Sequence, residues 1–221
     1  MKSKDLINKI KKNKLYKDNV DWATEPEVIS LIQSLIMLAS SKNILELGTF
    51  FGITTLSITN ILHSDGHVYT IDVEDFFSEY LLELDNKEKK KITFYQGYTQ
   101  NVLCGFKNIK FDFVYIDADH RFKYILRDLI IVLHDATNIV YRGVNYVILI
   151  LKLLNLIFLN TLFEIMILTT PYITGRPLSG VCIIKIKSKN ILIQYIIIIT
   201  LKTIAFIMPE PPKWNYRAGL K

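Results

Sequence analysis

The feature that most constrains this chain is a series of short apolar segments, each closed by an acidic residue or a glycine and most followed by a helical pattern. The first segment, residues 44–47, leads into a glycine-containing turn at 48–52 and a helical pattern at 54–62. The further segments that we predict as strands are 68–71, 92–95, 111–116 and 130–133. Strands that alternate with helices predict a parallel sheet covered on both faces.

The last third of the chain continues the pattern with a change of strand direction. Residues 163–168 and 181–187 are predicted strands, and the segment 175–177 between them is typical of the turn of an antiparallel pair. Residues 147–159 are apolar but interrupted by polar side chains, which favours a crossover helix over a bilayer span. The sequence therefore predicts an α/β fold: a Rossmann-like, doubly wound and mostly parallel sheet.

The composition agrees with one domain of ordinary size. The chain has 221 residues, of which 50% are apolar and 22% are charged, enough to bury a full core without disulfides or metal. This excludes a disordered tail and a small disulfide-stabilised protein. Cys104 and Cys182 are too few and too far apart for a zinc site, and they suit a reducing compartment. The first twenty residues contain no apolar segment of a secretory signal, so we expect a cytoplasmic protein.

A basic N-terminal segment, residues 1–21, precedes the predicted domain at 22–187. The net charge of +6 permits a polyanion or a membrane surface as partner. Much of this excess comes from lysines of the N-terminal segment, which we expect to be solvated, so no nucleic-acid partner is expected. Residues 5–17 have the apolar spacing of an amphipathic helix, which we expect to pack on the domain rather than on a membrane.

The domain is predicted to open with a helix. Thr24 has the side chain of a helix cap, and Pro26 suits the first turn. Acidic residues beside them favour the positive end of the helix dipole. The apolar pattern then continues until the helix ends near Ser40.

Residues that close the strands are the candidates for a site, because ligands of an open parallel sheet bind beyond the carboxyl ends of its strands. They are Glu46 with Gly48 and Gly52, Asp72, Gly97, Asp117 with Asp119 and His120, and His134 with Asp135. A dinucleotide site carries glycine where Glu46 stands, because the backbone must approach a pyrophosphate that a carboxylate would repel. The mostly acidic set therefore favours a cationic cofactor.

S-adenosylmethionine fits this pattern, since its sulfonium and amino groups are positive and its ribose offers two adjacent hydroxyls. We expect Glu46 to lie under the methionine end and Asp72 to accept both ribose hydroxyls. Gly48 and Gly52 let the backbone pass close to the cofactor. The predicted cofactor-binding set is completed by Thr49, Gly97 and Asp117. The alternative is that Glu46 and Asp72 only cap helices or lie in solvated loops.

Four segments in this order resemble class I S-adenosylmethionine-dependent methyltransferases: N-I-L-E-L-G-T-F-F-G-I-T-T, V-Y-T-I-D, F-D-F-V-Y-I-D-A-D-H-R-F-K-Y-I-L-R-D-L and V-L-H-D-A-T-N. The resemblance covers about residues 20–187 and points to the small-molecule O-methyltransferase group, including enzymes that modify sugars and natural products. It implies a seven-stranded sheet with an antiparallel last strand, and a small-molecule acceptor. The segment 22–26 also resembles the one that closes over the cofactor in such proteins.

The resemblance also implies a divalent metal near the acceptor. Relatives that act on catechols and caffeoyl esters bind the ion through the aspartate that closes the fourth strand and an Asp-Asn pair that closes the fifth. Asp117 and Asp135 match the two aspartates, but Ala136 stands in place of the Asn. The side chains available to replace it in a Mg²⁺ site are His134, Thr137 and Asn138.

Methyl transfer to a hydroxyl requires an acceptor oxygen that loses its proton and lies in line with the sulfonium carbon. His120 occupies the position where relatives carry a basic residue, and imidazole titrates near neutrality, as a base should. We therefore predict His120 and Asp117 as the catalytic residues. The alternative for His120 is an ordinary surface or helix-cap histidine.

One departure from the family pattern concerns the connection between the fourth and fifth predicted strands. Twelve residues separate Asp117 from Ile130, without Gly or Pro, and a crossover needs roughly 10–12. The sequence therefore predicts a shortened crossover that leaves part of one sheet face uncovered. This raises the alternative of a catalytically decayed protein that retains the fold.

An apolar C-terminal extension, residues 188–221, contains a nearly continuous apolar segment at 191–208. We expect this segment to pack on the uncovered sheet face or on a second subunit of a homo-oligomer, since either removes apolar surface from water. Its length is at the threshold of a transmembrane helix, so a membrane-attached protein is a further alternative.

Overall fold

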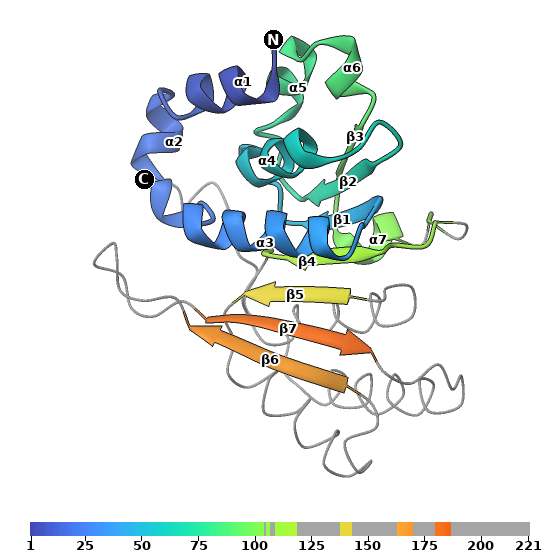
Figure 1. The fold of residues 1–221 in the computed structure, drawn as a ribbon. Helices are drawn as coiled ribbons and strands as arrows, with labels where there is room; N and C mark the ends of the chain where they lie inside the picture. Colours follow the sequence, from blue (N-terminus) through green and yellow to red (C-terminus); the bar gives the residue numbers. More distant parts are fainter. Residues whose placement is uncertain (104, 107–108, 119–137, 143–162, 170–179, 187–221) are drawn as a thin grey trace.

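A seven-stranded sheet, in the order β3-β2-β1-β4-β5-β7-β6, forms the centre of the molecule (Figure 1). The computed structural model describes residues 1–103, 105–106, 109–118, 138–142, 163–169 and 180–186. The strands are β1 Asn43–Leu47, β2 His67–Asp72, β3 Ile92–Gln96, β4 Phe113–Ile116, β5 Asn138–Arg142, β6 Phe163–Thr169 and β7 Gly180–Ile186. Strands β1 to β5 run parallel, which confirms the mostly parallel α/β fold expected from the sequence.

The predicted antiparallel pair corresponds to β6 and β7. Strand β7 runs antiparallel to both of its neighbours, β5 and β6, as expected for the last strand. The predicted turn at 175–177 and the predicted crossover helix at 147–159 lie outside the described residues.

The fifth strand differs from the prediction. The segment that pairs with β4 is Asn138–Arg142, whereas the sequence pattern placed the strand at 130–133, outside the described residues. Both segments are short apolar runs, which periodicity alone cannot tell apart. The connection from β4 therefore runs over residues 117–137, well beyond the roughly 10–12 that a crossover needs. The prediction of a shortened crossover is therefore wrong. It was the main reason to consider a catalytically decayed protein, and that reason no longer applies.

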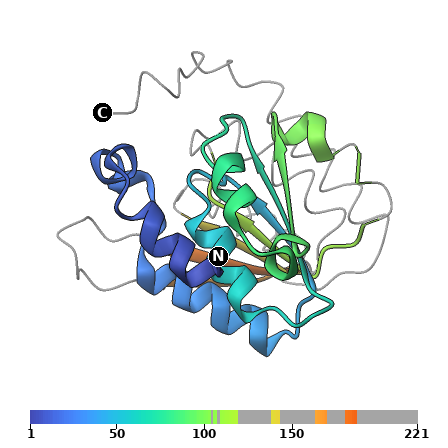
Figure 2. The same ribbon diagram turned by 90° about the horizontal axis from the view of Figure 1, so that it is seen from above.

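Helices precede and connect the strands of the first half of the chain. They are α1 Ser3–Ile10, α2 Lys14–Asp18, α3 Pro26–Leu38, α4 Ile53–Ile61, α5 Ser78–Glu83, α6 Asn86–Lys89 and α7 Thr99–Leu103, with a 3₁₀ turn at Val20–Trp22. Helix α4 packs against both α1 and α3 (Figure 1). Seen from above, α1 and α3 lie along the same side of the sheet (Figure 2).

Two details at the N-terminus correct the sequence predictions. The single helix expected at 5–17 is divided in two, because the Asn13 side chain accepts the Tyr16 N–H and caps α2 as a new helix. Helix α3 begins at Pro26, as expected, but its N-cap is Glu25 and not Thr24. The Thr24 hydroxyl forms contacts with other elements, described below.

Alternating residues of the strands face helices α3 and α4. Ile44, Val68 and Phe113 occupy neighbouring register positions on β1, β2 and β4, and they pack in one apolar cluster with residues of α3 and α4. Those helix residues include Ile32 and Ile58, which are fully buried. This cluster forms the apolar core between the sheet and helices α3 and α4.

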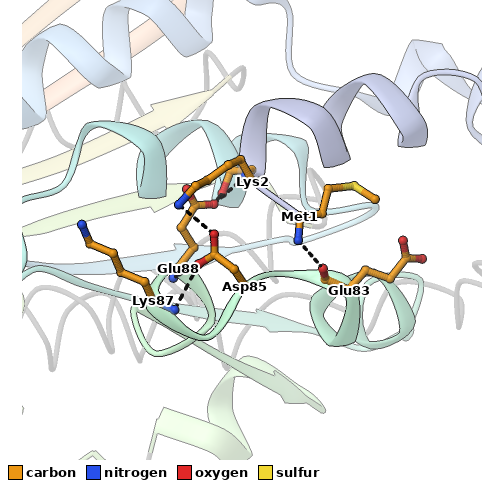
Figure 3. A network of polar contacts seen from close by, with 7 residues as sticks. Met1, Lys2, Glu83, Asp85, Lys87 and Glu88 are labelled. Carbon is orange, nitrogen blue, oxygen red and sulfur yellow. Dashed lines mark hydrogen bonds and ion pairs between the residues drawn. The ribbon is translucent and has the colours of Figure 1, made fainter.

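Helix α1 is held to the rest of the molecule by both apolar and polar contacts. Leu6 and Ile10 are fully buried in a second cluster with residues of α4. A set of polar contacts, which we name the N-terminal clamp, joins residues 1–9 to the segment 83–88, and Figure 3 shows the contacts of Met1 and Lys2. The clamp consists of Met1 N to the Glu83 carbonyl at 3.0 Å, Lys2 to Asp85 at 2.8 Å, Lys9 to Glu83 at 2.6 Å and Ser3 to Glu88. The amphipathic N-terminal helix thus packs on the domain, as the sequence predicted.

None of the helices in the described part of the chain is long and apolar enough to cross a membrane. The segment 191–208, which raised that alternative, lies outside the described residues together with the whole extension 188–221.

Candidate functional site

Three neighbouring strands bring six residues together at the carboxyl edge of the sheet. Glu46 on β1 lies opposite Thr70 on β2 and Tyr115 on β4. Two residues further along each of these three segments lie Gly48, Asp72 and Asp117. Because residues two apart on a strand share a face, Glu46, Thr70, Asp72 and Tyr115 lie on the face that packs against α3 and α4, and Gly48 and Asp117 directly follow β1 and β4.

Glu46 is a carboxylate in the core. Its side chain is 0% exposed, and its Oε2 accepts hydroxyl protons from Thr55 of α4 and from Thr70 at 2.6 Å. Its Oε1 has no hydrogen-bond partner among the residues that the structure describes. Burial, reinforced by the charges of Asp117 and Asp72, raises the pKa of Glu46 to about 8, although the two hydroxyls lower it. Glu46 therefore holds a proton at neutral pH unless a cation comes close to it.

Asp72 is oriented by the glycine-containing turn. The carboxylate is 6% exposed, and its Oδ2 accepts the backbone N–H groups of Thr49 and Phe50, both at 2.8 Å. Oδ1 accepts the N–H of Glu74 at 3.1 Å. Burial raises the pKa of Asp72, against the opposing effect of these N–H groups. Because an ionised carboxylate oxygen has two lone pairs, Oδ1 has capacity for a ligand hydroxyl.

The turn itself depends on its two glycines. Gly48 has φ +97°, and a Cβ there would lie 2.5 Å from the carbonyl oxygen of Asp117. Gly52 has φ +77°, and a Cβ there would lie 2.2 Å from the ring of Phe77. Both positions combine a left-handed backbone with close packing, so only glycine fits without displacing a neighbour. The sequence assigned these glycines to the approach of a cofactor, and the structure gives them an additional role in packing.

Asp117 is held by two hydroxyl groups. Its Oδ2 accepts from the phenol of Tyr115 at 2.8 Å and from Oγ1 of Thr24 at 2.8 Å. Thr24 in turn accepts from Oγ1 of Thr54 at 3.0 Å. The segment that contains Thr24 is the one whose resemblance implied closure over the cofactor, and the structure brings it to the end of β4.

Gly97 lies at the same edge, where its N–H donates to the Asp72 carbonyl at 2.7 Å. The remaining predicted site residues are His120, with its neighbour Asp119, and the pair His134 and Asp135, all outside the described residues. The last two precede β5 in the chain, and their assignment to the site stays a prediction.

The predicted metal site stays a prediction. Among the residues that the structure describes, no group of three His, Cys, Asp or Glu side chains could hold a metal ion. Asp117 is the one residue of the predicted set Asp117, Asp135 and His134 that the structure describes, and one of its oxygens accepts from two hydroxyls. The described residues do not fit a metal on their own.

The sequence predictions missed the hydroxyl side chains that surround the carboxylates. Thr70 and Tyr115 could have been found, because the period of two along their strands places them beside Glu46 once the strands are paired. Thr24 and Thr55 carry no such signal, since they reach the site from a loop and a helix.

Comparison with known proteins gives the family of the chain. The model of a family described as O-methyltransferase matches residues 2–144. Tricin synthase 2 from Oryza sativa subsp. japonica is 32% identical over 104 residues, which cover 44% of this chain and 36% of that protein. Caffeoyl-CoA O-methyltransferase from Populus kitakamiensis is 34% identical over 94 residues, 40% of each chain. The chain thus spans less than half the length of these relatives.

Solved structures agree with the fold. The O-methyltransferase TomG from Streptomyces achromogenes, in complex with S-adenosylmethionine, superposes with a TM-score of 0.67 at 17% identity, over 83% of this chain and 90% of that chain. An O-methyltransferase from Bacillus cereus, in complex with S-adenosylhomocysteine, gives 0.61 at 18% identity, over 83% and 91%. At this identity the similarity establishes the fold alone.

Proposed function

The chain belongs to the O-methyltransferase family, and on this premise we propose that it transfers a methyl group from S-adenosylmethionine to a hydroxyl of a small molecule. The observation that carries the proposal is the environment of Glu46, a fully buried carboxylate with one oxygen unpartnered in the described part of the chain. Such a group destabilises a core unless a ligand of opposite charge completes it. The sulfonium and amino groups of S-adenosylmethionine carry that charge.

The residues assigned to the cofactor act on its two ends. Glu46 receives the positive charge of the methionine end, and Oδ1 of Asp72 accepts a ribose hydroxyl. Two N–H groups of the turn at 48–52 donate to the Asp72 carboxylate, and the N–H of Gly97 donates to the backbone carbonyl of Asp72. Both carboxylates are therefore oriented before the cofactor binds, which reduces the entropy lost on binding.

The acceptor is assigned to the neighbouring strand. S-adenosylmethionine supplies a methyl group bound to a positively charged sulfur, and the acceptor hydroxyl loses its proton as that group is transferred. Asp117 directly follows β4, on which Tyr115 pairs with Glu46, and we assign its carboxylate to the orientation of the acceptor hydroxyl. The assignment of His120 as the base remains a prediction from the sequence.

Binding and turnover together test the proposal. We expect calorimetric titration with S-adenosylmethionine to give a saturable signal, and Glu46→Gln to weaken binding by about 10–100-fold, because the amide keeps the hydroxyl contacts but has no charge. Glu27→Gln, an exposed carboxylate on α3, is the matched control and should bind as the wild type does. Transfer is followed with labelled methyl groups and caffeoyl-coenzyme A as acceptor, because a relative carries that name.

Absence of any binding signal in the wild type would contradict the proposal. An equal affinity in Glu46→Gln would show instead that the buried carboxylate does not recognise the cofactor's charge. Binding without transfer to caffeoyl-coenzyme A would reject that acceptor, and a panel of hydroxyl-bearing sugars and phenols would follow.

A further inference from the structure

Tyr115 combines an apolar location with polar contacts at its hydroxyl. The side chain is 0% exposed and belongs to the apolar cluster under the sheet, where its ring packs with residues of α3. Its hydroxyl reaches the edge of that cluster and donates to Oδ2 of Asp117 at 2.8 Å. A phenylalanine would fill the same core volume, so packing alone does not account for the hydroxyl.

The hydroxyl protons around Asp117 point in one direction. Thr54 donates to Thr24, and Thr24 donates to Oδ2 of Asp117. Tyr115 donates its single hydroxyl proton to the same oxygen, and its own oxygen lies 3.3 Å from Oγ1 of Thr24. Since each hydroxyl has one proton, the three groups form a converging set whose final acceptor is the carboxylate.

Two donors on one oxygen fix the plane of a carboxylate. The last torsion of an aspartate is broad, so its contacts decide the orientation of the carboxylate. With Tyr115 on β4 and Thr24 in the loop before α3 both in place, Oδ2 is held from two elements, and Oδ1 acquires a fixed direction. Orientation of this kind matters for group transfer, where small displacements of the reacting atoms have large effects on rate.

We infer that Tyr115 and Thr24 are positioning residues of the acceptor site, which hold Asp117 in the orientation that receives the acceptor hydroxyl. This inference rests on the proposed function, because it assigns Asp117 to the acceptor. It goes beyond that function in making the loop before α3 part of the acceptor site. Neither residue touches the reacting atoms in this account, and both act through Asp117.

The test removes each hydroxyl without removing its side chain. In Tyr115→Phe and Thr24→Val we expect kcat for methyl transfer to caffeoyl-coenzyme A to fall about tenfold. The dissociation constant of S-adenosylmethionine should stay within about twofold of the wild type, since Glu46 and Asp72 are unaltered. Thr24→Ser should restore kcat, because serine keeps the donor. The double variant should lose little more than either single variant, as expected for two residues that act on one group.

Matched controls separate this role from general packing. Tyr69→Phe makes the same change on β2, and Thr59→Val removes a buried hydroxyl of α4 that donates to the Thr55 carbonyl at 2.8 Å. Both should keep the wild-type kcat. If Tyr115→Phe also keeps it, or if it loses cofactor affinity in proportion to kcat, the positioning role is refuted.

A crystal structure of Tyr115→Phe gives a result that does not depend on turnover. A rotated or divided Asp117 carboxylate supports the inference, and an unchanged one overturns it. A wild-type protein that neither binds S-adenosylmethionine nor transfers methyl groups would count against the proposed function and leave this structural comparison decisive for the network itself.

Discussion

Carboxylates occur in two contrasting settings in this molecule. In the N-terminal clamp, Glu83 and Asp85 face lysines at the surface, and Glu88 accepts from Ser3. The hydrogen bond from Lys2 is the main cause that lowers the pKa of Asp85 to about 2. At the carboxyl edge of the sheet, Glu46 and Asp72 are buried, form no ion pair within the described residues, and have raised pKa values.

The difference indicates what each set is for. A carboxylate whose hydrogen-bond and ion-pair partners all come from the chain needs no ligand, and at the surface such a pair contributes little to stability. An ionised carboxylate that is buried without a cation lowers the stability of the unliganded protein, and either protonation or a bound ligand of positive charge reverses that effect. We therefore interpret the clamp as structural, and the carboxyl edge as the proposed site.

The largest effect that would sharpen this comparison is the pH dependence caused by Glu46. Below its ordinary pKa of 4.5 the residue is protonated in both folded and unfolded chains. As the pH rises from 4.5 to about 8, the unfolded chain ionises and the folded one does not, so the folded state loses stability. At pH 8 Glu46→Gln should therefore be more stable than the wild type by roughly 3–5 kcal/mol, and about equal to it at pH 4. Denaturant unfolding without cofactor measures this, and equal slopes with pH in both proteins would refute it.

A second change breaks the site by displacing its carboxylates. Gly48→Ala places a Cβ 2.5 Å from the Asp117 carbonyl on a left-handed backbone. We expect a loss of about 2–4 kcal/mol in unfolding free energy and weaker cofactor binding, because Asp117 must move away from β1. Gly66→Ala is the control, since its nearest neighbour would be the Leu62 side chain at 3.0 Å and its φ is not positive. Similar losses in the two variants would contradict the account of Gly48.

A third effect of intermediate size concerns binding. Because Glu46 carries a proton below about pH 8 in the free protein, a cationic cofactor must displace that proton. The affinity for S-adenosylmethionine should therefore rise with pH by up to about tenfold per unit until pH 8, and level off above it. Titrations in buffers of different ionisation enthalpy should detect the release of nearly one proton at pH 7. In Glu46→Gln both the slope and the release should be absent.

The smallest expected effect belongs to the clamp. Lys9→Ala removes a pair in which the amine contacts both Glu83 oxygens, at 2.7 and 2.6 Å. The change in unfolding free energy should stay within about 0.5 kcal/mol and should vanish in 1 M salt. Leu6→Ala, on the buried side of the same helix, should cost about 2–4 kcal/mol and is the contrasting variant. A larger effect of Lys9 than of Leu6 would mean that polar contacts, rather than burial, hold α1.

Part of the site was predictable because it depends on local pattern. The apolar segments that became β1 to β4 carry Glu46, Asp72, Gly97 and Asp117 at or just beyond their carboxyl ends, and the parallel arrangement of strands brings these ends to one edge. The fifth strand was not predictable in the same way, because two apolar segments compete for one place beside β4. Register and connection length select between them, and neither is visible in a window of the sequence.

The sequence by itself determined the alternation of strands and helices, the acidic character of the carboxyl edge and the glycines of its turn, because these follow from residue type and spacing along one segment. Only the tertiary structure decided that Oε1 of Glu46 has no partner among the described residues, and that the Thr24 hydroxyl meets Asp117 instead of capping a helix. The physical reason is that such contacts join residues distant in the chain, and which donors reach a buried carboxylate depends on how helices and loops pack over the sheet.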